Sequence, residues 1–232
     1  MFTADASGTS ATLRKVVLFE GLDDEGLAAL EKRLRRRRFG KGHVLFMRGD
    51  PGDDLFIIES GTVKICLTSA EGKEITLALL GPGEFLGELA LLDGQPRSSD
   101  ALTMEPCQFL LLGRNDFRQF IQERPSVTLQ LLEVLSRRLR SDNQLIQDAA
   151  FFDVPARLAR VILALAESLG QPVGPGTAIA RRLTQSELAG MVGATRESVN
   201  RWLVYFERQG LIRRQNGMIT VAKPDGLRRR IY

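Results

Sequence analysis

The chain has 232 residues, of which 44% are hydrophobic and 26% charged, values typical of a globular chain with about two domains. No apolar run approaches the roughly 18–20 residues of a membrane span, and the polar N-terminus lacks the features of a secretory signal. One histidine and two cysteines exclude multi-histidine, four-cysteine zinc and iron–sulfur sites. These counts favour a reduced cytoplasmic binding protein with no tightly bound cofactor or metal.

Charge is distributed unevenly along the chain. Residues 1–150 carry 19 Lys and Arg against 22 Asp and Glu, whereas residues 151–232 carry 13 against 6. A basic C-terminal segment behind an acidic larger one indicates a polyanionic partner for the C-terminal segment. From charge alone, a solvated basic surface without a partner is an equally good interpretation.

The first predicted element is a helix over Leu18–Leu34, where leucines recur at helical spacing. The arginine run Arg35–Arg38 follows it directly. Such runs are usually solvated, so we expect an exposed face here and keep a binding role as the less favoured alternative.

Short β-rich runs punctuated by glycine follow, from Phe39 to about Leu112. Several short strands at about ten-residue spacing predict a small sandwich or barrel. The expected strands are Val44–Met47, Leu55–Glu59, Val63–Leu67, Ile75–Leu80 and Gln108–Leu112.

A long helix is predicted over Pro125–Ala150, because no helix breaker occurs before Pro155. A series of its residues steps alternately by three and four, which is the spacing of a coiled-coil seam. The pattern favours self-association over packing of an ordinary helix on its own β unit. The expected dimer-interface residues are Leu132, Leu135, Leu139, Asp142, Ile146 and Ala149. Asp142 is charged, so this position needs a partner or a ligand.

The joint after the long helix carries helix-start signals. Asp153 is a suitable N-cap and Pro155 suits the first turn of a helix over Ala156–Leu169. We expect a loop over Gly170–Gly176.

The C-terminal segment contains a helix-turn-helix pattern. Thr184 and Glu187 form a capping-box signature that opens a short helix, Gln185–Met191. After a glycine turn, Thr195 caps a longer helix, Arg196–Arg208.

Two β-prone runs follow this second helix and flank Asn216-Gly217. Asn-Gly between such runs is a strong hairpin signal. The two helices and the hairpin together predict a winged helix.

The start of the second helix carries the groups that read base edges. Arg196, Glu197, Asn200 and Arg201 cluster on one helical face. Arginine bonds guanine at two atoms and glutamate accepts from cytosine, so this face predicts DNA reading over a solvated face of intrahelical Arg–Glu pairs. The expected DNA-contacting residues are Thr184, Gln185, Thr195, Arg196, Glu197, Ser198, Asn200 and Arg201.

A glycine-rich stretch, residues 83–98, lies late in the β unit. Gly87 permits close backbone approach, Arg97 supplies a charged fork and Ser98 a hydroxyl. Glu88 cannot bind phosphate but can accept from a sugar hydroxyl. The set fits a ribose phosphate, and the alternative is a turn with a structural Glu–Arg pair.

The chain resembles the CRP/FNR family of bacterial transcription regulators. Four ordered signals carry the resemblance: Gly52 and Gly61, the stretch Gly87 to Ser98, the long helix into Phe152-Asp153-Val154, and Val192 to Val199. It implies an α+β fold with a cyclic-nucleotide-binding β-roll (jelly-roll-like) over residues 1–124, a dimerisation helix over 125–151 and a winged helix-turn-helix over 152–232. It also implies a non-enzymatic homodimer on palindromic TGTGA-like DNA, with RNA polymerase as a partner.

The resemblance also implies a set of nucleotide-binding residues. They are Gly87, Glu88, Leu89, Ala90, Arg97, Ser98, Arg138, Asp142 and Asn143. Glu88 is implied to hold the ribose 2′-hydroxyl, and Arg97 and Ser98 the cyclic phosphate. Arg138 is expected to support the charge of Asp142.

The favoured allosteric ligand is cAMP, and two alternatives stay open. Asn143 can satisfy adenine, whereas the acceptor-only Asp142 is also a natural guanine partner, so cGMP is an alternative. In the other alternative Asp142 pairs with an arginine of the second subunit, and abundance alone sets activity. A redox switch through Cys66 and Cys107 is less favoured, because both lie in expected strands where buried structural thiols are commoner.

Overall fold

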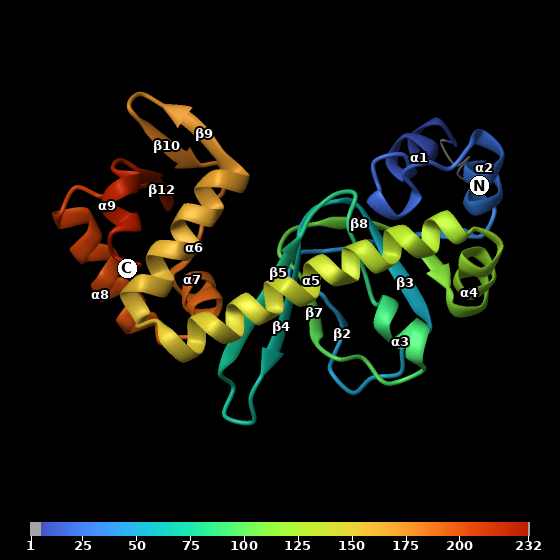
Figure 1. Cartoon of the computed structure of the whole chain (residues 1–232), viewed down its shortest axis with the longest axis horizontal. Coiled ribbons are helices and arrows are strands. Elements are labelled where there is room, and N and C mark those ends of the chain that lie inside the picture. The colour runs from blue at the N-terminus through green and yellow to red at the C-terminus, as the bar shows by residue number, and fades with distance from the viewer. Residues whose placement is uncertain (1–5, 232) are drawn as a thin grey trace. The chain divides into compact units, whose positions relative to one another are not determined.

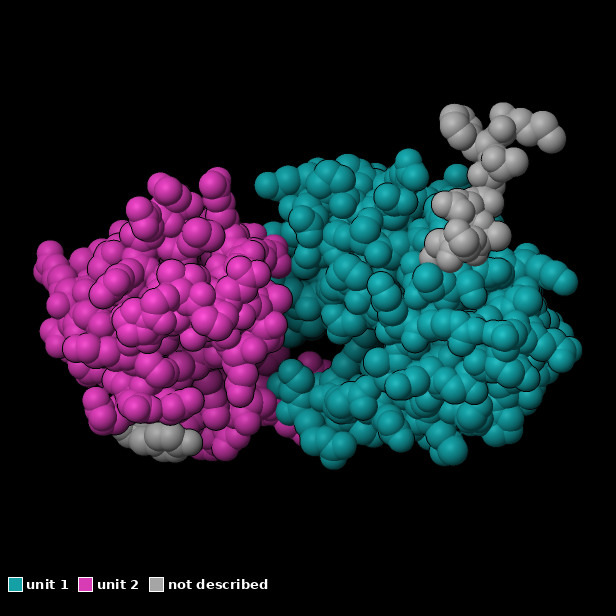
Figure 2. Space-filling view, turned by 90° about the horizontal axis from the view of Figure 1, so that it is seen from above, with its two compact units in different colours: residues 1–67, 77–141 teal, residues 68–76, 142–232 magenta. Residues whose placement is uncertain are grey.

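The computed structural model describes residues 6–231, which form two compact units, coloured separately in Figure 2. The first unit contains the chain up to Leu67 together with Leu77–Ser141, and the second contains Thr68–Thr76 and the chain from Asp142 onward. The division falls inside the long helix α5 (Pro125–Phe151), seen in Figure 1. Within residues 6–231, no helix has both the length and the hydropathy needed to cross a membrane.

The first unit is a β-roll with flanking helices. Two four-stranded sheets have the orders β1-β8-β3-β6 and β2-β7-β4-β5. Its elements are α1 (Ala6–Leu13), a 3-10 turn (Val17–Phe19), α2 (Asp24–Glu31), β1 (Leu34–Phe39), β2 (Val44–Phe46), β3 (Asp54–Ser60), β4 (Val63–Thr68), β5 (Glu74–Leu80), β6 (Phe85–Leu86), α3 (Glu88–Asp93), β7 (Asp100–Thr103), β8 (Cys107–Gly113), α4 (Arg114–Glu123) and the first part of α5. The division between the units leaves the last residue of β4 and the first three of β5 in the second unit.

Strand β3 shows how the sheet β1-β8-β3-β6 is covered on both faces. Successive side chains of a strand point to opposite faces. Leu55 and Ile57 enter a core shared with helices α1, α4 and α5, whereas Phe56 and Ile58 enter a second core inside the roll. A strand whose two faces both pack into apolar cores has apolar residues at consecutive positions. This explains the continuous apolar run in the sequence of β3.

The second unit is a winged helix. Its sheet has the order β11-β12-β10-β9, and one apolar core joins the sheet to the helices. The elements are the end of α5, α6 (Val154–Leu169), β9 (Gly170–Val173), β10 (Gly176–Ile179), α7 (Gln185–Val192), α8 (Arg196–Arg208), β11 (Ile212–Gln215), β12 (Met218–Val221) and α9 (Pro224–Arg228). The expected α+β fold is confirmed, with a β-roll, a long helix and a winged helix-turn-helix.

Two local predictions were wrong, and one strand was not predicted. The helix expected over Leu18–Leu34 is interrupted, because Gly21 takes a φ of +98° and Asp23 caps a new helix by accepting from the Gly26 N–H at 2.8 Å. The arginine run Arg35–Arg38 is exposed, as expected, but it lies in β1, a strand that was not predicted and whose backbone pairs with β8. The loop expected over Gly170–Gly176 belongs to the β9–β10 hairpin, which the strand-poor composition concealed.

Candidate functional site

Arg97 is the centre of a buried site in the first unit. Its side chain is 6% exposed, and its Nη1 and Nη2 donate to the backbone carbonyls of Gly87 at 2.8 Å and Asp54 at 2.9 Å. The guanidinium lies over the ring of Phe46, 4.3 Å from its centroid. Gly87 has a φ of +89°, and a Cβ there would approach Arg97 Nη1 to 2.3 Å. Glycine is therefore required at this position on both conformational and steric grounds.

The third guanidinium nitrogen of Arg97 has no partner. Nε is buried and makes no hydrogen bond within the part of the chain that the structure describes. Burial lowers the pKa of Arg97, and the carboxylates of Asp54 and Glu88 oppose that shift. A buried cation with an unused N–H is an energetic cost unless an acceptor arrives, so this donor fits an anionic ligand.

Glu88 lies beside this cation at the start of α3. Its side chain is 5% exposed, and its Oε1 accepts from Arg138 Nη1 at 2.8 Å. The other oxygen, Oε2, is buried without a partner among residues 6–231. The prediction that Arg138 would support Asp142 was wrong, because its guanidinium bonds Glu88 and the Phe85 carbonyl and lies over the Phe85 ring.

The site thus offers a free cationic donor and a free anionic acceptor. A phosphate can accept and a sugar hydroxyl can donate, so a ribose phosphate has the chemistry to complement both groups. Of the other residues expected here, Ala90 is buried, whereas Ser98 and Leu89 are exposed. Asp142 and Asn143 are exposed on α5 beyond Arg138 and belong to the second unit, and their role toward a base stays a prediction.

Two arginines of α4 support the site, and the sequence interpretation missed them. Arg114 Nη2 donates to the Gly52 carbonyl at 2.7 Å. Arg118 donates to the carbonyls of Leu91 and Leu92 at the end of α3, at 2.9 and 3.0 Å. They act on backbone atoms far away in the sequence, so no spacing signal indicates them.

The seam of α5 is largely open to solvent in the single chain. Leu132, Leu139 and Ile146 are 54%, 61% and 66% exposed, and Ala149 is also exposed. Leu135 instead packs partly against the core of the first unit. Three large apolar side chains seven residues apart form one uncovered line along the helix.

The helix-turn-helix begins with the predicted caps. Thr184 Oγ1 accepts from the Glu187 N–H at 3.1 Å while the Glu187 carboxylate accepts from the Thr184 N–H at 2.6 Å, which confirms the capping box. Thr195 caps the next helix by accepting from the Ser198 N–H at 3.2 Å. These bonds fix where α8 starts, and hence which residues its first turn presents.

The first turns of α8 present the expected polar face. Arg196, Glu197 and Arg201 are exposed, and within residues 6–231 no ion pair joins Glu197 to either arginine. Gln185 Nε2 donates to Asn200 Oδ1 at 2.8 Å, and Arg196 Nε donates to Gln185 Oε1 at 3.3 Å. The side chains of Gln185 and Asn200 therefore join α7 to α8.

The two cysteines are poor candidates for a redox switch. Cys66 and Cys107 are both buried, and no disulfide joins them in the described structure. Burial raises the pKa of the Cys107 thiol, which disfavours the reactive thiolate. The geometry supports packing roles in β4 and β8.

Two family profiles match the chain. The cyclic nucleotide-binding domain matches residues 36–124, and the Crp-like helix-turn-helix domain matches residues 156–230. The two profiles together span most of the chain and coincide with the β-roll and the winged helix.

Curated relatives match over nearly the whole length. The "CRP-like cAMP-activated global transcriptional regulator" of Mycobacterium tuberculosis is 39% identical over 94% of this chain and 97% of that protein. The "Cyclic AMP receptor protein" of Thermus thermophilus is 35% identical over 89% and 92%. Among solved structures, the c-di-GMP-responsive regulator CLP of Xanthomonas campestris has a TM-score of 0.78 at 26% identity, covering 86% of this chain and 99% of that one.

The chain therefore belongs to the CRP/FNR family. It is a CRP-like DNA-binding transcription regulator with a cyclic nucleotide-binding domain.

Proposed function

We propose that this protein is a cytoplasmic, homodimeric transcription regulator, without catalytic activity, that cAMP controls allosterically. The observation that carries the proposal is the pair of buried, unpartnered atoms in the described chain, Arg97 Nε and Glu88 Oε2. A cyclic ribose phosphate would supply an acceptor to the first and a hydroxyl donor to the second. The names of the Mycobacterium and Thermus relatives support cAMP over other ligands of this class.

A change of helix pairing is the proposed allosteric step. The apolar line of Leu132, Leu139 and Ile146 would meet its copy in a second chain, and Arg138 on the same helix bonds Glu88. A nucleotide that engages Glu88 would then bias the helix pair. It shifts the population only if it binds the DNA-competent state more tightly than the other state.

DNA contact is proposed through the exposed start of α8. In a dimer two such helices would enter successive major grooves about 34 Å apart, which requires a palindromic site. Arg196, Glu197 and Arg201 would read a TGTGA-like half-site, and RNA polymerase is the further proposed partner. The excess of basic residues after residue 150 supports binding to a polyanion.

Titration calorimetry with cAMP, cGMP and c-di-GMP tests the ligand, followed by DNA binding with and without the nucleotide that binds. Micromolar binding of cAMP that tightens DNA affinity is the expected result. If the protein prefers cGMP or c-di-GMP, that nucleotide replaces cAMP as the proposed ligand. A preference for c-di-GMP would agree with the Xanthomonas regulator. Tight DNA binding by a protein that binds none of the three would refute nucleotide control and favour regulation by abundance.

The base-contacting step has its own test. Asp142 and Asn143 are proposed to meet the base, and Asp142→Thr is expected to change the ratio of cAMP to cGMP affinity. An unchanged ratio would remove Asp142 from the proposed site. Asn143→Ala in parallel shows which of the two side chains carries any preference.

A further inference from the structure

Glu207, in the last turn of α8, is bound to the wing strand β11 through three hydrogen bonds. Its Oε1 accepts from the backbone N–H of Arg214 at 3.1 Å, and its Oε2 accepts from Nε at 3.1 Å and Nη2 at 2.8 Å of the same residue. The Arg214 side chain holds the pKa of Glu207 below its ordinary value. Because one bond goes to the main chain, the pair fixes the strand itself and not only a side chain.

The wing carries a sharply turned tip beside the start of α7. Asn216 has a φ of +52° and Gly217 of +77°, as a two-residue hairpin turn requires. The Gly217 carbonyl accepts from the Leu183 N–H at 3.2 Å. The tip is thus held at the point in the chain that leads into the Thr184 cap.

A cleft of about 300 Å³ connects the wing pair, Glu207 and Arg214, to the expected DNA face. Gln185, Asn216 and Gly217 line it together with the wing pair. Gln185 in turn accepts from Arg196, the first residue of α8. The wing tip therefore lines the same cleft as Gln185, the side chain that bonds the first residue of α8.

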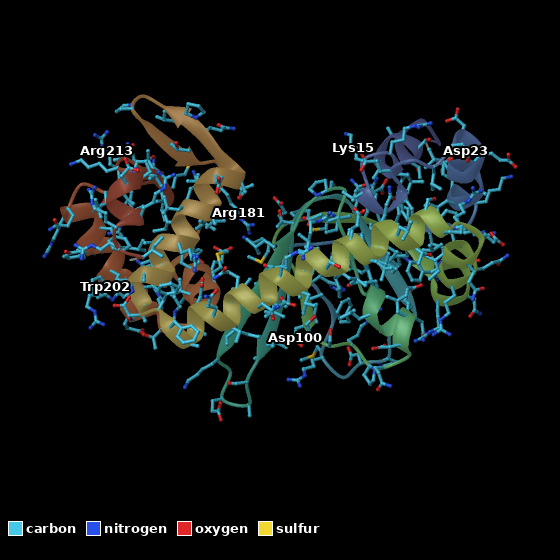
Figure 3. All side chains as sticks on the ribbon, viewed as in Figure 1. Lys15, Asp23, Asp100, Arg181, Trp202 and Arg213 are labelled. Atoms are coloured by element: carbon cyan, nitrogen blue, oxygen red, sulfur yellow. The ribbon has the colours of Figure 1, made fainter. Side chains whose placement is uncertain are left out.

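Two adjacent arginines of β11 have different surroundings. Arg214 is committed to Glu207, whereas Arg213 is exposed and its side chain has no interaction partner in the described structure. Figure 3 labels Arg213 at the periphery of this domain. An unpaired arginine on the wing suits a phosphate of a DNA strand whose bases α8 reads.

We infer that Glu207 is a positioning residue: through Arg214 it fixes the wing on α8, so that Arg213 and the tip reach the DNA backbone while Arg196 reads bases. The inference rests on the proposed DNA contact by α8. It makes an unusual prediction, because removing a negative charge from a DNA-binding domain ordinarily tightens binding.

We test this inference by measuring the affinity of the whole chain for a duplex that carries a TGTGA-type palindrome. The variants are Glu207→Gln, Arg214→Gln and Arg213→Gln. Asp225→Asn is the control, because it also removes one carboxylate. The Asp225 side chain pairs with Arg228 within α9, away from the bonds that hold the wing. We expect Glu207→Gln and Arg214→Gln to weaken DNA binding about three- to ten-fold. Asp225→Asn should leave binding unchanged or tighter. For Arg213→Gln, the slope of the logarithm of DNA affinity against the logarithm of salt concentration should become shallower by the amount that corresponds to about one phosphate contact.

Amide hydrogen exchange without DNA provides the structural readout. Glu207→Gln should speed exchange at the Arg214 amide, and Arg213→Gln should not, with far-UV spectra confirming that both variants fold. Equal DNA affinity of Glu207→Gln and Asp225→Asn would overturn the inference. A wild-type protein that fails to bind DNA with or without cAMP would refute the proposed function itself, and the inference with it.

Discussion

Arg138 on α5 donates to Glu88 on α3, and this bond at 2.8 Å joins the long helix to the turn that begins at Gly87. The Glu88 side chain is 5% exposed, whereas Arg138 is 30% exposed. A carboxylate so deeply buried needs its cation. The residue proposed to take the ribose hydroxyl is therefore already bonded to the helix proposed to form the dimer.

Replacing Arg138 by alanine is expected to lower the free energy of unfolding. Glu88 would keep its burial and lose its cation, a loss that costs about 3–5 kcal/mol for a fully buried pair. The partial exposure of Arg138 reduces this to about 2 kcal/mol. Urea unfolding at neutral pH measures the change.

Arg140→Ala is the matched control for Arg138→Ala. Arg140 is exposed on the same helix, and its side chain has no hydrogen-bond or ion-pair partner in residues 6–231. We expect its loss to change stability by less than about 0.5 kcal/mol. If the two variants were equally stable, the Glu88 bond would have no energetic role.

Gly87→Ala is expected to disturb both stability and nucleotide binding. The φ of +89° is unfavourable for alanine, and the new Cβ would displace the Arg97 fork. A cost of about 1–3 kcal/mol follows from the backbone alone. Urea unfolding and cAMP titration measure the two effects.

Gly81→Ala controls for the loss of a glycine, since Gly81 has open space around it and no positive φ. Equal unfolding curves for both variants would show that the turn tolerates a side chain.

Leu139→Lys is expected to dissociate the proposed dimer. The side chain is 61% exposed in the single chain and lies at the middle of the apolar line. In a symmetric dimer the substitution occurs twice in the interface, and each copy replaces an apolar contact by a charge. The dimer dissociation constant should therefore rise about 100-fold. Sedimentation equilibrium measures it, with the exposed Ser141→Lys as a control of equal charge. A Leu139→Lys protein that stays dimeric would place the interface elsewhere.

The sequence predicts best where a local rule acts. The Thr184–Glu187 box and the Thr195 cap both depend on residues three apart, and both were confirmed at those positions. The buried site was predicted only in part, because Arg97 was expected from its chemistry while its bond to the Asp54 carbonyl joins segments 43 residues apart. No spacing in a sequence specifies such a contact.

The strand that was not predicted and the wrong partner of Arg138 have the same origin. The arginine run forms a strand because β8 supplies hydrogen-bond partners, and its polar side chains carry no alternation that marks a strand. The partner of Arg138 was placed one turn away at Asp142, although a buried carboxylate on another element competes more strongly for a cation than an exposed one. Tertiary contacts decided both cases.

Arg196→Ala is expected to relax DNA specificity at one base pair of each half-site. A two-point arginine contact to guanine contributes about 1–3 kcal/mol of discrimination against another base. Binding to duplexes with each half-site position changed in turn measures the effect. Arg208→Ala, an exposed arginine in the last turn of α8, should weaken all sequences alike. Uniform weakening by Arg196→Ala as well would assign it to phosphate contact.

Glu207 is expected to make the stability of the protein depend on acid pH. Arg214 lowers the folded-state pKa of Glu207 below the value of about 4.3 in an unfolded chain. The ionised group therefore stabilises the fold fully above the unfolded pKa, and this contribution is lost as the pH falls through the lowered folded value. Glu207→Gln lacks the titrating group, so its stability deficit against the wild type should be constant near neutral pH and shrink below about pH 4. Urea unfolding of both proteins across this range measures the deficit. A deficit that does not change with pH would show that the ionised carboxylate is not what binds the wing, and that the glutamine of the variant destabilises the protein through packing alone.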